Sequence, residues 1–392
     1  MADDWGLLEP LGAAASATSD DAVLAALVAV ERGLIRAWGD VLDDDLSAVA
    51  AALDAGALDR EALRAGARSG GVPVIALVEQ LRAQAEAIAD GAGDRVHAGA
   101  TSQDILDSAL VLVARTALAE ARGHLATAGA ALVALAGQER DTRSIARTLG
   151  QHAEPSTIGV TVAGWLDGVS SAIEAVDGTL FPVQLGGAVG TGEAFDRIAR
   201  WADAATELRA ALASELGLAD PGRAWHTERS PILRIAGTAA LVAAALGRIG
   251  REIAFLARTE IGEVAVASTG GSSAMPHKRN PVDAVLLTAN GVRAPGLVAT
   301  VHAASVSQDA RPPGEWHAEW QALRGLVRLA LEGADAAAGL AGGLTIDRAA
   351  VGRNLAMSAD LEGDPAATLA ASARIVAAAT ERFRSLSTKD AS

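Results

Sequence analysis

Two long stretches rich in Ala, Leu and Val constrain the fold of this chain more than any other feature. One spans residues 103–137, and the other starts at Ser230-Pro231 and is expected to run for about 38 residues, to about residue 268. Ser followed by Pro is a common helix start, because Ser caps free N–H groups and Pro fits the first turn. Helices of this length are typical of an extended bundle whose exposed apolar faces meet in an oligomer. Aromatic residues make up only 3% of the chain and Tyr is absent, which also favours helices. We predict an all-α protein.

The overall charge limits the possible partners. The chain of 392 residues carries a net charge of −15, which argues against a nucleic-acid partner because there is no basic stripe to neutralise phosphates. An anionic substrate would need local cations, for which the candidates are Lys278, Arg279, Arg147, Arg293 and Arg311.

Cellular location can be addressed from composition and hydropathy. The chain has no Cys, which fits a reducing cytoplasm, and its acidic start shows no signal-peptide pattern. The longest apolar run, 13 residues between Arg234 and Arg248, is too short to cross a bilayer. We expect a cytoplasmic protein with no membrane segment.

One carboxylate lies on an apolar helix face near the N-terminus. The positions of Leu24, Leu27, Val28 and Leu34 follow a 3.6-residue period, and Glu31 falls on the same face. We interpret Glu31 as a structural carboxylate paired with an arginine, with a functional carboxylate as the alternative.

Residues 270–281 form a loop rich in reactive groups. They contain two glycines, two adjacent hydroxyls, three cationizable side chains, an amide and two prolines. Gly and Pro both break helices, so this segment is predicted to be a loop. A hydroxyl-bearing cationic loop between long helices suits a lid that closes on an anion and brings a base with it.

Residues 96–104, Val-His-Ala-Gly-Ala-Thr-Ser-Gln-Asp, predict the start of a helix. Thr101 and Asp104 have the spacing of a capping box. The helix N-terminus and the hydroxyls of Thr101 and Ser102 can also bind a carboxylate, and the two roles are compatible. His97, just before this helix, is a candidate acid/base, with a structural hydrogen-bonded histidine as the alternative. The glycine-rich residues 186–192 lack a preceding strand, so we do not interpret them as a phosphate cradle.

Three segments together resemble the fumarase/aspartase superfamily, over about residues 5–360. Residues 101–104 contain its Thr-Ser-x-Asp core, and residues 146–155 resemble its Arg-Thr-His-x-Gln-x-Ala-x-Pro segment. Its signature loop, Gly-Ser-Ser-x-Met-Pro-x-Lys-x-Asn-Pro, is matched at every fixed position by Gly271, Ser272, Ser273, Met275, Pro276, Lys278, Asn280 and Pro281. The resemblance implies a small helical N-terminal domain (1–100), a central long-helix bundle (101–343) and a short helical C-terminal domain (344–392). It also implies a homotetramer whose active sites are built from three subunits.

Within the superfamily the chain resembles the bacterial 3-carboxy-cis,cis-muconate cycloisomerase branch. The His of the second segment, which takes part in proton transfer in adenylosuccinate and argininosuccinate lyases, is Leu149 here, and this branch also carries an apolar residue there. We interpret the nearby His152 as a packing or hydrogen-bonding residue. Residues 99–105, 163–166 and 314–320 also resemble the branch. There are two departures: the usual Glu-His-Glu-Arg is Gln308-Asp309-Ala310-Arg311, which keeps only the arginine, and the C-terminal domain is short.

The resemblance implies roles for particular residues. Ser272 would carry the proton, with Lys278 and His97 as further catalytic groups. The loop N–H groups, Lys278 and Asn280 would stabilise the aci-carboxylate intermediate. No metal, nucleotide or redox cofactor is implied. The residues expected to bind substrate are Thr101, Ser102, Arg147, Thr148, Gln151, Ser273, Met275, Asn280 and Arg311.

The leading hypothesis is the lactonisation of a tricarboxylate, 3-carboxy-cis,cis-muconate, in aromatic catabolism. One carboxylate adds to an alkene of the same molecule, and a proton is delivered to a carbon next to a carboxylate. The alternative is a lyase that acts on a substituted succinate or a modified muconate. A non-catalytic oligomer with this fold is a third class, but it would be free to lose Ser272, Lys278 or Asn280, and all three are present.

Overall fold

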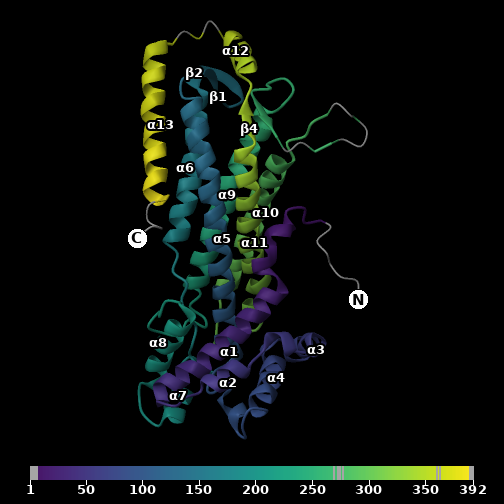
Figure 1. Cartoon of the computed structure of the whole chain (residues 1–392), viewed down its shortest axis with the longest axis vertical. Helices are drawn as coiled ribbons and strands as arrows, with labels where there is room; N and C mark the ends of the chain where they lie inside the picture. The colour runs from purple at the N-terminus through teal and green to yellow at the C-terminus, as the bar shows by residue number, and fades with distance from the viewer. Residues whose placement is uncertain are drawn as a thin grey trace.

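A bundle of long helices forms the middle of the molecule (Figure 1). The computed structural model describes residues 8–267, 270–271, 275, 278–358, 361 and 363–387. The predicted all-α fold is confirmed, since strands are few and short. The bundle helices pack against one another along their lengths. They are α5 (Ser102–Gln138), α6 (Ile158–Asp177), α9 (Ser230–Leu256), α10 (Val282–Ser305) and α11 (Glu315–Gly342).

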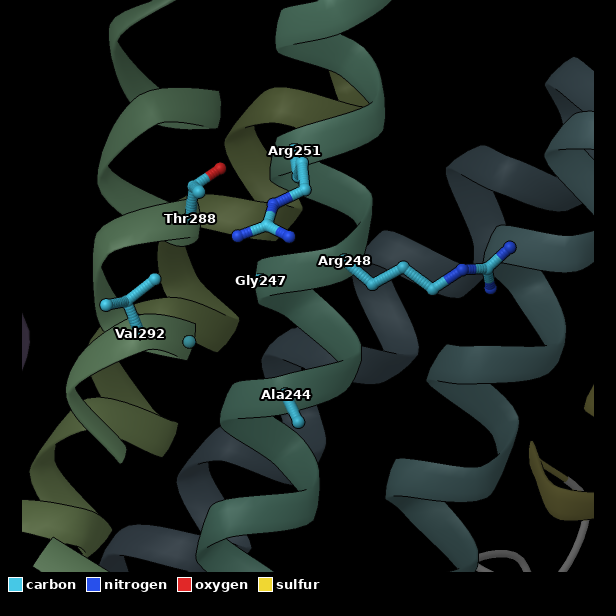
Figure 2. A pocket seen from close by; sticks show the side chains of 7 residues that line it. Ala244, Gly247, Arg248, Arg251, Thr288 and Val292 are labelled. Carbon is cyan, nitrogen blue, oxygen red and sulfur yellow. The ribbon is translucent and has the colours of Figure 1, made fainter. Parts of the chain in front are cut away.

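Small residues allow two of these helices to come very close. A Cβ atom added to Gly247 of α9 would lie 2.8 Å from the Cα of Gly291 on α10. Real Cβ atoms do not approach other atoms so closely, so glycine at this position lets the two backbones touch. A hollow of about 260 Å³ opens on the outside of this crossing. Figure 2 shows Arg251 reaching across it toward Thr288 of α10, while Arg248 points away from it. Arg248 donates to the carbonyl of Gly164 on α6 at 3.0 Å.

Shorter helices gather at the end of the bundle where α5 begins (Figure 1). Helix α1 packs against both α5 and α8, and it carries the fully buried Trp38 and Glu31. The helices at this end are α1 (Asp20–Leu42), α2 (Ser47–Ala52), α3 (Arg60–Gly70), α4 (Val74–Glu86), α7 (Glu193–Ala199) and α8 (Ala204–Leu216), with the 3₁₀ turns Gly12–Thr18, Ala55–Ala57 and Ala92–Arg95. The domain boundaries at residues 100 and 343 stay predictions, and α7 and α8 lie among the N-terminal helices in space.

The opposite end of the bundle carries the strands. Strands β1 (Arg143–Thr148) and β2 (Gln151–Thr157) form an antiparallel hairpin, and β3 (Val264–Val266) pairs antiparallel with β4 (Leu344–Ile346). After α12 (Arg348–Ala356), the last helix α13 (Pro365–Ser387) runs back along α6 (Figure 1). The ring of Phe383 occupies the place where Gly129 of α5 would carry a side chain, since a Cβ there would lie 2.1 Å from the ring.

One of the two predicted long helices has its expected range, and the other ends earlier than expected. The helix predicted over residues 103–137 is confirmed as α5. The extension of the second helix to residue 268 is wrong, because α9 ends at Leu256. The chain turns there through Gly262, whose φ of 62° suits glycine, and the N–H of Glu263 bonds back to the Leu256 carbonyl at 3.0 Å. The following residues pair with β4 and can no longer continue a helix.

By length and composition alone, α9 and α10 would also qualify as membrane-spanning helices. The expectation that no segment reaches that length is therefore wrong, because both helices are mostly apolar and tolerate isolated charged residues. In α9 half of the most apolar window is buried inside the protein, as in a core helix. In α10 the buried share is only 28%. Two such helices are weak support for a membrane protein.

Candidate active site

The N-terminus of α5 is fixed by a fully buried carboxylate. Asp104 accepts a hydrogen bond from the backbone N–H of Thr101 at 3.0 Å, as the predicted capping box requires. It also accepts from the N–H groups of Gly186 and Gly187, both at 2.9 Å, and lies 2.8 Å from Nε2 of His226. The glycine-rich segment that the sequence left without a role is thus tied to the start of α5. A cap with this many donors holds the helix end in one position.

Arg311 brings a positive charge to this helix end. Its Nη2 donates to the Thr101 hydroxyl at 3.0 Å and to the Ala188 carbonyl at 3.3 Å, and its Nε donates to the Gln103 side chain at 3.1 Å. Among the described residues no carboxylate forms an ion pair with Arg311. A guanidinium without a counter-charge, beside the partial positive charge of a helix N-terminus, is suited to bind an anion. Thr101, Ser102 and Arg311 therefore lie together as predicted substrate-binding residues.

His97 lies next to this group and pairs with Glu31. Its Nδ1 is 2.7 Å from Oε1 of Glu31, whose side chain is fully buried. Our interpretation of Glu31 as the partner of an arginine is wrong, because helix α1 packs its apolar face against the turn that carries His97. The ring of His97 remains 15% exposed.

A buried ionic network joins the first turns of α5 to α11. Arg229 donates to Asp107 at 2.7 Å and to Glu319, and the Trp316 indole N–H donates to Asp107 at 2.8 Å. Burial alone would lower the pKa of Arg229, but the charges of Asp107 and Glu319 outweigh burial and raise it. Burial raises the pKa of Glu319 to about 7, against the opposing attraction of Arg229. One cation shared by two carboxylates therefore favours a proton on Glu319 in the folded protein.

The sequence contained little that predicted this network. Glu319 lies in residues 314–320, which the sequence marked only by their resemblance to the cycloisomerase branch. Trp316 in this segment is buried, and it packs edge-on against Trp320 with ring centroids 4.8 Å apart. Asp107 follows Asp104 on the same helix face, which is a weak signal of a second buried carboxylate.

The predicted residues of the second segment lie at the other end of the bundle. Thr148 and Gln151 are paired across the β1–β2 hairpin, and Leu149 and Gly150 form its two-residue turn with φ values of 52° and 80°. Positive φ at both positions is typical of a type I′ turn, which seldom places a leucine there. The Leu149 side chain is fully exposed at the tip.

Arg147 of β1 is held in the protein interior. Its guanidinium donates to both carboxylate oxygens of Glu263, at 2.6 and 3.1 Å, and Asn354 donates to the same carboxylate at 2.7 Å. The Glu263 side chain is only 2% exposed. Because its charge is already neutralised, Arg147 in this arrangement is not a free cation for a substrate. A hollow of about 420 Å³ lies beside it, lined also by Gly150 and Thr161. His152 bonds to the Ser358 hydroxyl at 2.5 Å, which fits its interpretation as a hydrogen-bonding residue.

The signature loop begins and ends at the same end of the bundle. The backbones of Gly270 and Asn280 exchange two hydrogen bonds, at 3.0 and 3.1 Å, which close the base of the loop. Lys278 and Met275 are exposed. The predicted Ser272 and Ser273 lie outside the described residues. Of the other candidate cations, Arg279 is exposed, and Arg293 on α10 lies 4.0 Å from Glu9.

The predicted site residues therefore form two groups within one chain. Thr101, Ser102, His97 and Arg311 lie where α5 begins. The β1–β2 hairpin lies at the other end of the bundle (Figure 1), together with Gly270 and Asn280 at the base of the signature loop. Helix α5 has 37 residues, so the two groups are separated by roughly 55 Å at 1.5 Å per residue. One chain by itself cannot bring them into contact with a small substrate. Within the described part of the chain, no cluster of three or more His, Asp or Glu residues could hold a metal ion.

The fold and these motifs define a helical enzyme of the lyase class. The sequence pattern of the Lyase family matches residues 20–296, and the chain belongs to this family. It is 42% identical over 365 residues to the nitrosuccinate lyase of Streptomyces davaonensis, covering 90% of this chain and 77% of that protein. It is 39% identical over 367 residues to the 3-carboxy-cis,cis-muconate cycloisomerase of Pseudomonas aeruginosa, covering 91% and 78%.

Solved structures show the same relationship. The 3-carboxy-cis,cis-muconate lactonizing enzyme from Pseudomonas putida superposes with a TM-score of 0.85 at 29% identity, covering 94% of this chain and 96% of that one. A fumarate lyase from Mesorhizobium gives a TM-score of 0.75 at 28% identity, over 95% and 88%. The predicted resemblance to this superfamily and to its cycloisomerases is confirmed.

Proposed function

We propose that this enzyme is a 3-carboxy-cis,cis-muconate cycloisomerase. One carboxylate oxygen of the substrate bonds to an alkene carbon of the same molecule, and a proton is added at the carbon next to a carboxylate, which gives a γ-lactone. The observation that carries the proposal is Arg311 at the start of α5, a cation without a carboxylate partner among the described residues. Support also comes from relatives with this activity in their names, at 34–39% identity.

The reaction requires the protein to stabilise negative charge and to deliver one proton to a defined carbon. Proximity of the two reacting groups is already provided by the substrate, so the enzyme must fold it and stabilise the doubly charged aci-carboxylate. Arg311 and the α5 N-terminus would hold one carboxylate, beside His97. Lys278 and Asn280 would stabilise the aci-carboxylate from the signature loop, with Ser272 as the proton carrier. A serine hydroxyl can serve in this way only in a closed site with preorganised dipoles and cations.

A second candidate is elimination from a substituted succinate. It is favoured by the similarity to a nitrosuccinate lyase and by Gln308-Asp309-Ala310, where the cycloisomerase branch has Glu-His-Glu. In that reaction a base would remove a proton next to a carboxylate, and the C–N bond would break. Nitrosuccinate would then give fumarate and nitrite, with atoms and charge balanced. The same proton carrier and the same carboxylate sites serve both reactions.

We further propose that the enzyme works as a homotetramer with shared sites. The distance along α5 between the two groups of site residues supports this, because neighbouring chains can supply the missing group. The apolar face of α10 also supports it, since Val285 and Val292 are 51% and 63% exposed. Leu149, exposed at the hairpin tip, would be covered by another copy. Burial of such surfaces is the usual driving force for association.

An ultraviolet absorbance assay on purified protein tests the activity. Loss of the conjugated diene of 3-carboxy-cis,cis-muconate, without added metal or nucleotide, is the expected result, and lactone formation is confirmed by mass spectrometry. The same preparation is offered nitrosuccinate, with nitrite and fumarate as readouts. Turnover of nitrosuccinate alone would replace the first proposal by the second. Turnover of neither substrate by a folded protein would contradict both.

A further inference from the structure

The pair formed by Glu31 and His97 is unlike an ordinary buried ion pair. Glu31 is completely buried, yet only Oε1 has a partner, the Nδ1 atom of His97 at 2.7 Å. The other oxygen, Oε2, has no hydrogen-bond partner among the described residues. A buried carboxylate normally satisfies its acceptors, because a buried acceptor without a donor loses the hydrogen bonds that water would provide.

The neighbouring Asp104–His226 pair provides an internal comparison. Asp104 is equally buried, but it accepts from three backbone N–H groups in addition to its histidine. Asp104 therefore has a structural role that does not depend on His226, because it holds the start of α5 and the glycine-rich segment together. Glu31 caps no helix, and its one hydrogen-bond partner among the described residues is His97. The packing of α1 therefore places the Glu31 carboxylate against the Nδ1 atom of His97.

The backbone at His97 is held in a conformation that it would not adopt freely. Its φ is 62°, in the left-handed region that disfavours residues with a side chain. The turn is fixed from outside by the indole N–H of Trp38, which donates to the Ala98 carbonyl at 3.0 Å, and by Gly99, which is packed against Phe195. Backbone strain kept in place by surrounding contacts is often found at functional sites.

We propose that Glu31 is a positioning residue for His97, and this rests on the proposed function. Its carboxylate accepts a hydrogen bond from Nδ1–H and so fixes the tautomer in which Nδ1 carries the proton and Nε2 does not. Nε2, which has no partner among the described residues, is then available to the substrate as the second acid/base. When Nε2 takes up a proton, the buried Glu31 carboxylate supplies the counter-charge, as the carboxylate does in other His–carboxylate pairs. The proton returns to the substrate or to water.

The tautomer can be measured without any substrate. Histidine labelled with ¹⁵N in the ring is incorporated into the wild-type enzyme, and His97 is assigned by loss of its signals in His97→Gln. The expected spectrum has a proton on Nδ1 and none on Nε2. In Glu31→Gln the carboxamide can donate to Nδ1, so a substantial share of His97 should change to the Nε2–H tautomer. Circular dichroism and the oligomer size are compared first, because Gln has the shape of Glu and should preserve the fold.

The second test is steady-state kinetics on whichever of the two candidate substrates the enzyme turns over. Glu31→Gln should lower kcat by roughly 10²- to 10⁴-fold with little change in KM, which is the usual range for a misplaced acid/base. Glu31→Asp should recover part of the loss. The matched control is Asp335→Asn, which removes the carboxylate beside His124, 3.4 Å away on the surface, and should leave kcat unchanged.

Two results would overturn the proposal. One is a wild-type His97 that carries its proton on Nε2, or a tautomer that Glu31→Gln does not change. The other is an intact kcat in Glu31→Gln or in His97→Gln. The tautomer of His97 can be measured even in a protein that turns over neither candidate substrate. A failure of the proposed reaction is therefore distinguishable from a failure of this assignment.

Discussion

Arg311 donates from Nη2 to the hydroxyl of Thr101 at 3.0 Å, although 210 positions separate the two residues in the sequence. The contact joins the segment before α11 to the first residue before α5. The hydrogen bond orients the Thr101 hydroxyl and holds the Arg311 guanidinium at the N-terminus of α5, the positive end of the helix dipole. This arrangement concentrates positive potential in a protein whose net charge is −15.

Removing this cation should weaken substrate binding. In Arg311→Gln we expect kcat/KM to fall about 10- to 100-fold, mainly through KM, since a hydrogen-bonded charge contributes about 1.5–3 kcal/mol. Arg197→Gln is the control, because Arg197 lies on the surface and pairs with Glu193 in the same helix. Steady-state kinetics at several ionic strengths provides the measurement. An unchanged KM in Arg311→Gln would remove Arg311 from the binding site.

Ser272 is expected to be essential for turnover and dispensable for folding. The expectation rests on the resemblance, since Ser272 lies outside the described residues. Ser272→Ala should reduce kcat below detection while size-exclusion chromatography with light scattering shows an unchanged oligomer. Ser273→Ala is the matched control at the next position, and it should retain part of the activity. Wild-type rates in Ser272→Ala would exclude the serine as proton carrier.

How far the sequence predicts this molecule depends on the range of the interactions. The start of α5 was predictable, because Thr101 and Asp104 act within a single turn of helix. The pairing of Glu31 with His97 and of Arg147 with Glu263 was not, because both depend on how distant elements pack. The true end of α9 was signalled only by Gly262, whose conformation is decided by the following strand. The separation of the site into two groups follows from the length of α5, which the sequence did predict.

The pair of Arg147 with Glu263 should matter more for stability than for binding. Arg147→Gln leaves a buried carboxylate without its charge partner, and we expect a loss of about 3–5 kcal/mol in the free energy of unfolding. In the double variant Arg147→Gln/Glu263→Gln most of this stability should return, with KM close to that of the wild type. Urea unfolding followed by circular dichroism, together with steady-state kinetics, tests both statements. A stable double variant with a strongly raised KM would show that Arg147 binds substrate, as the resemblance implies.

Stability should fall as pH rises through neutrality, because of Glu319. Burial raises its pKa to about 7 from an ordinary value of 4.5. Between these pH values the folded state keeps a proton that the unfolded chain has released, so raising the pH favours unfolding. The contribution is fully present below about pH 4.5, is lost as pH rises through about 7, and amounts to at most about 3 kcal/mol.

Urea unfolding at pH 5, 6, 7 and 8, at constant ionic strength and protein concentration, measures this effect. Glu319→Gln should flatten the dependence on pH. Burial also raises the pKa of Glu332 to about 7, so Glu332→Gln should remove a separate part of the slope. A wild-type stability that rises between pH 5 and 7 would contradict the assignment.

Mixed oligomers should reach a kcat/KM that neither parent variant has. Arg311 lies at the start of α5, and Gly270 and Asn280, which close the base of the loop that contains Ser272 in the sequence, lie at its far end, roughly 55 Å away along a helix of 37 residues. If each active site takes these two groups from different chains, co-expression of Ser272→Ala with a strongly impaired Arg311 variant yields some sites in which both groups are intact. We expect a kcat/KM for the mixture, measured at substrate concentrations well below KM, that is a substantial fraction of the wild-type value, whereas the separately purified variants mixed without subunit exchange stay impaired. The double variant Ser272→Ala/Arg311→Gln co-expressed with itself is the control. Activity in the mixture no greater than the sum of the two parents would show that the site is not shared, and a closed site within one chain would then need a different arrangement of α5.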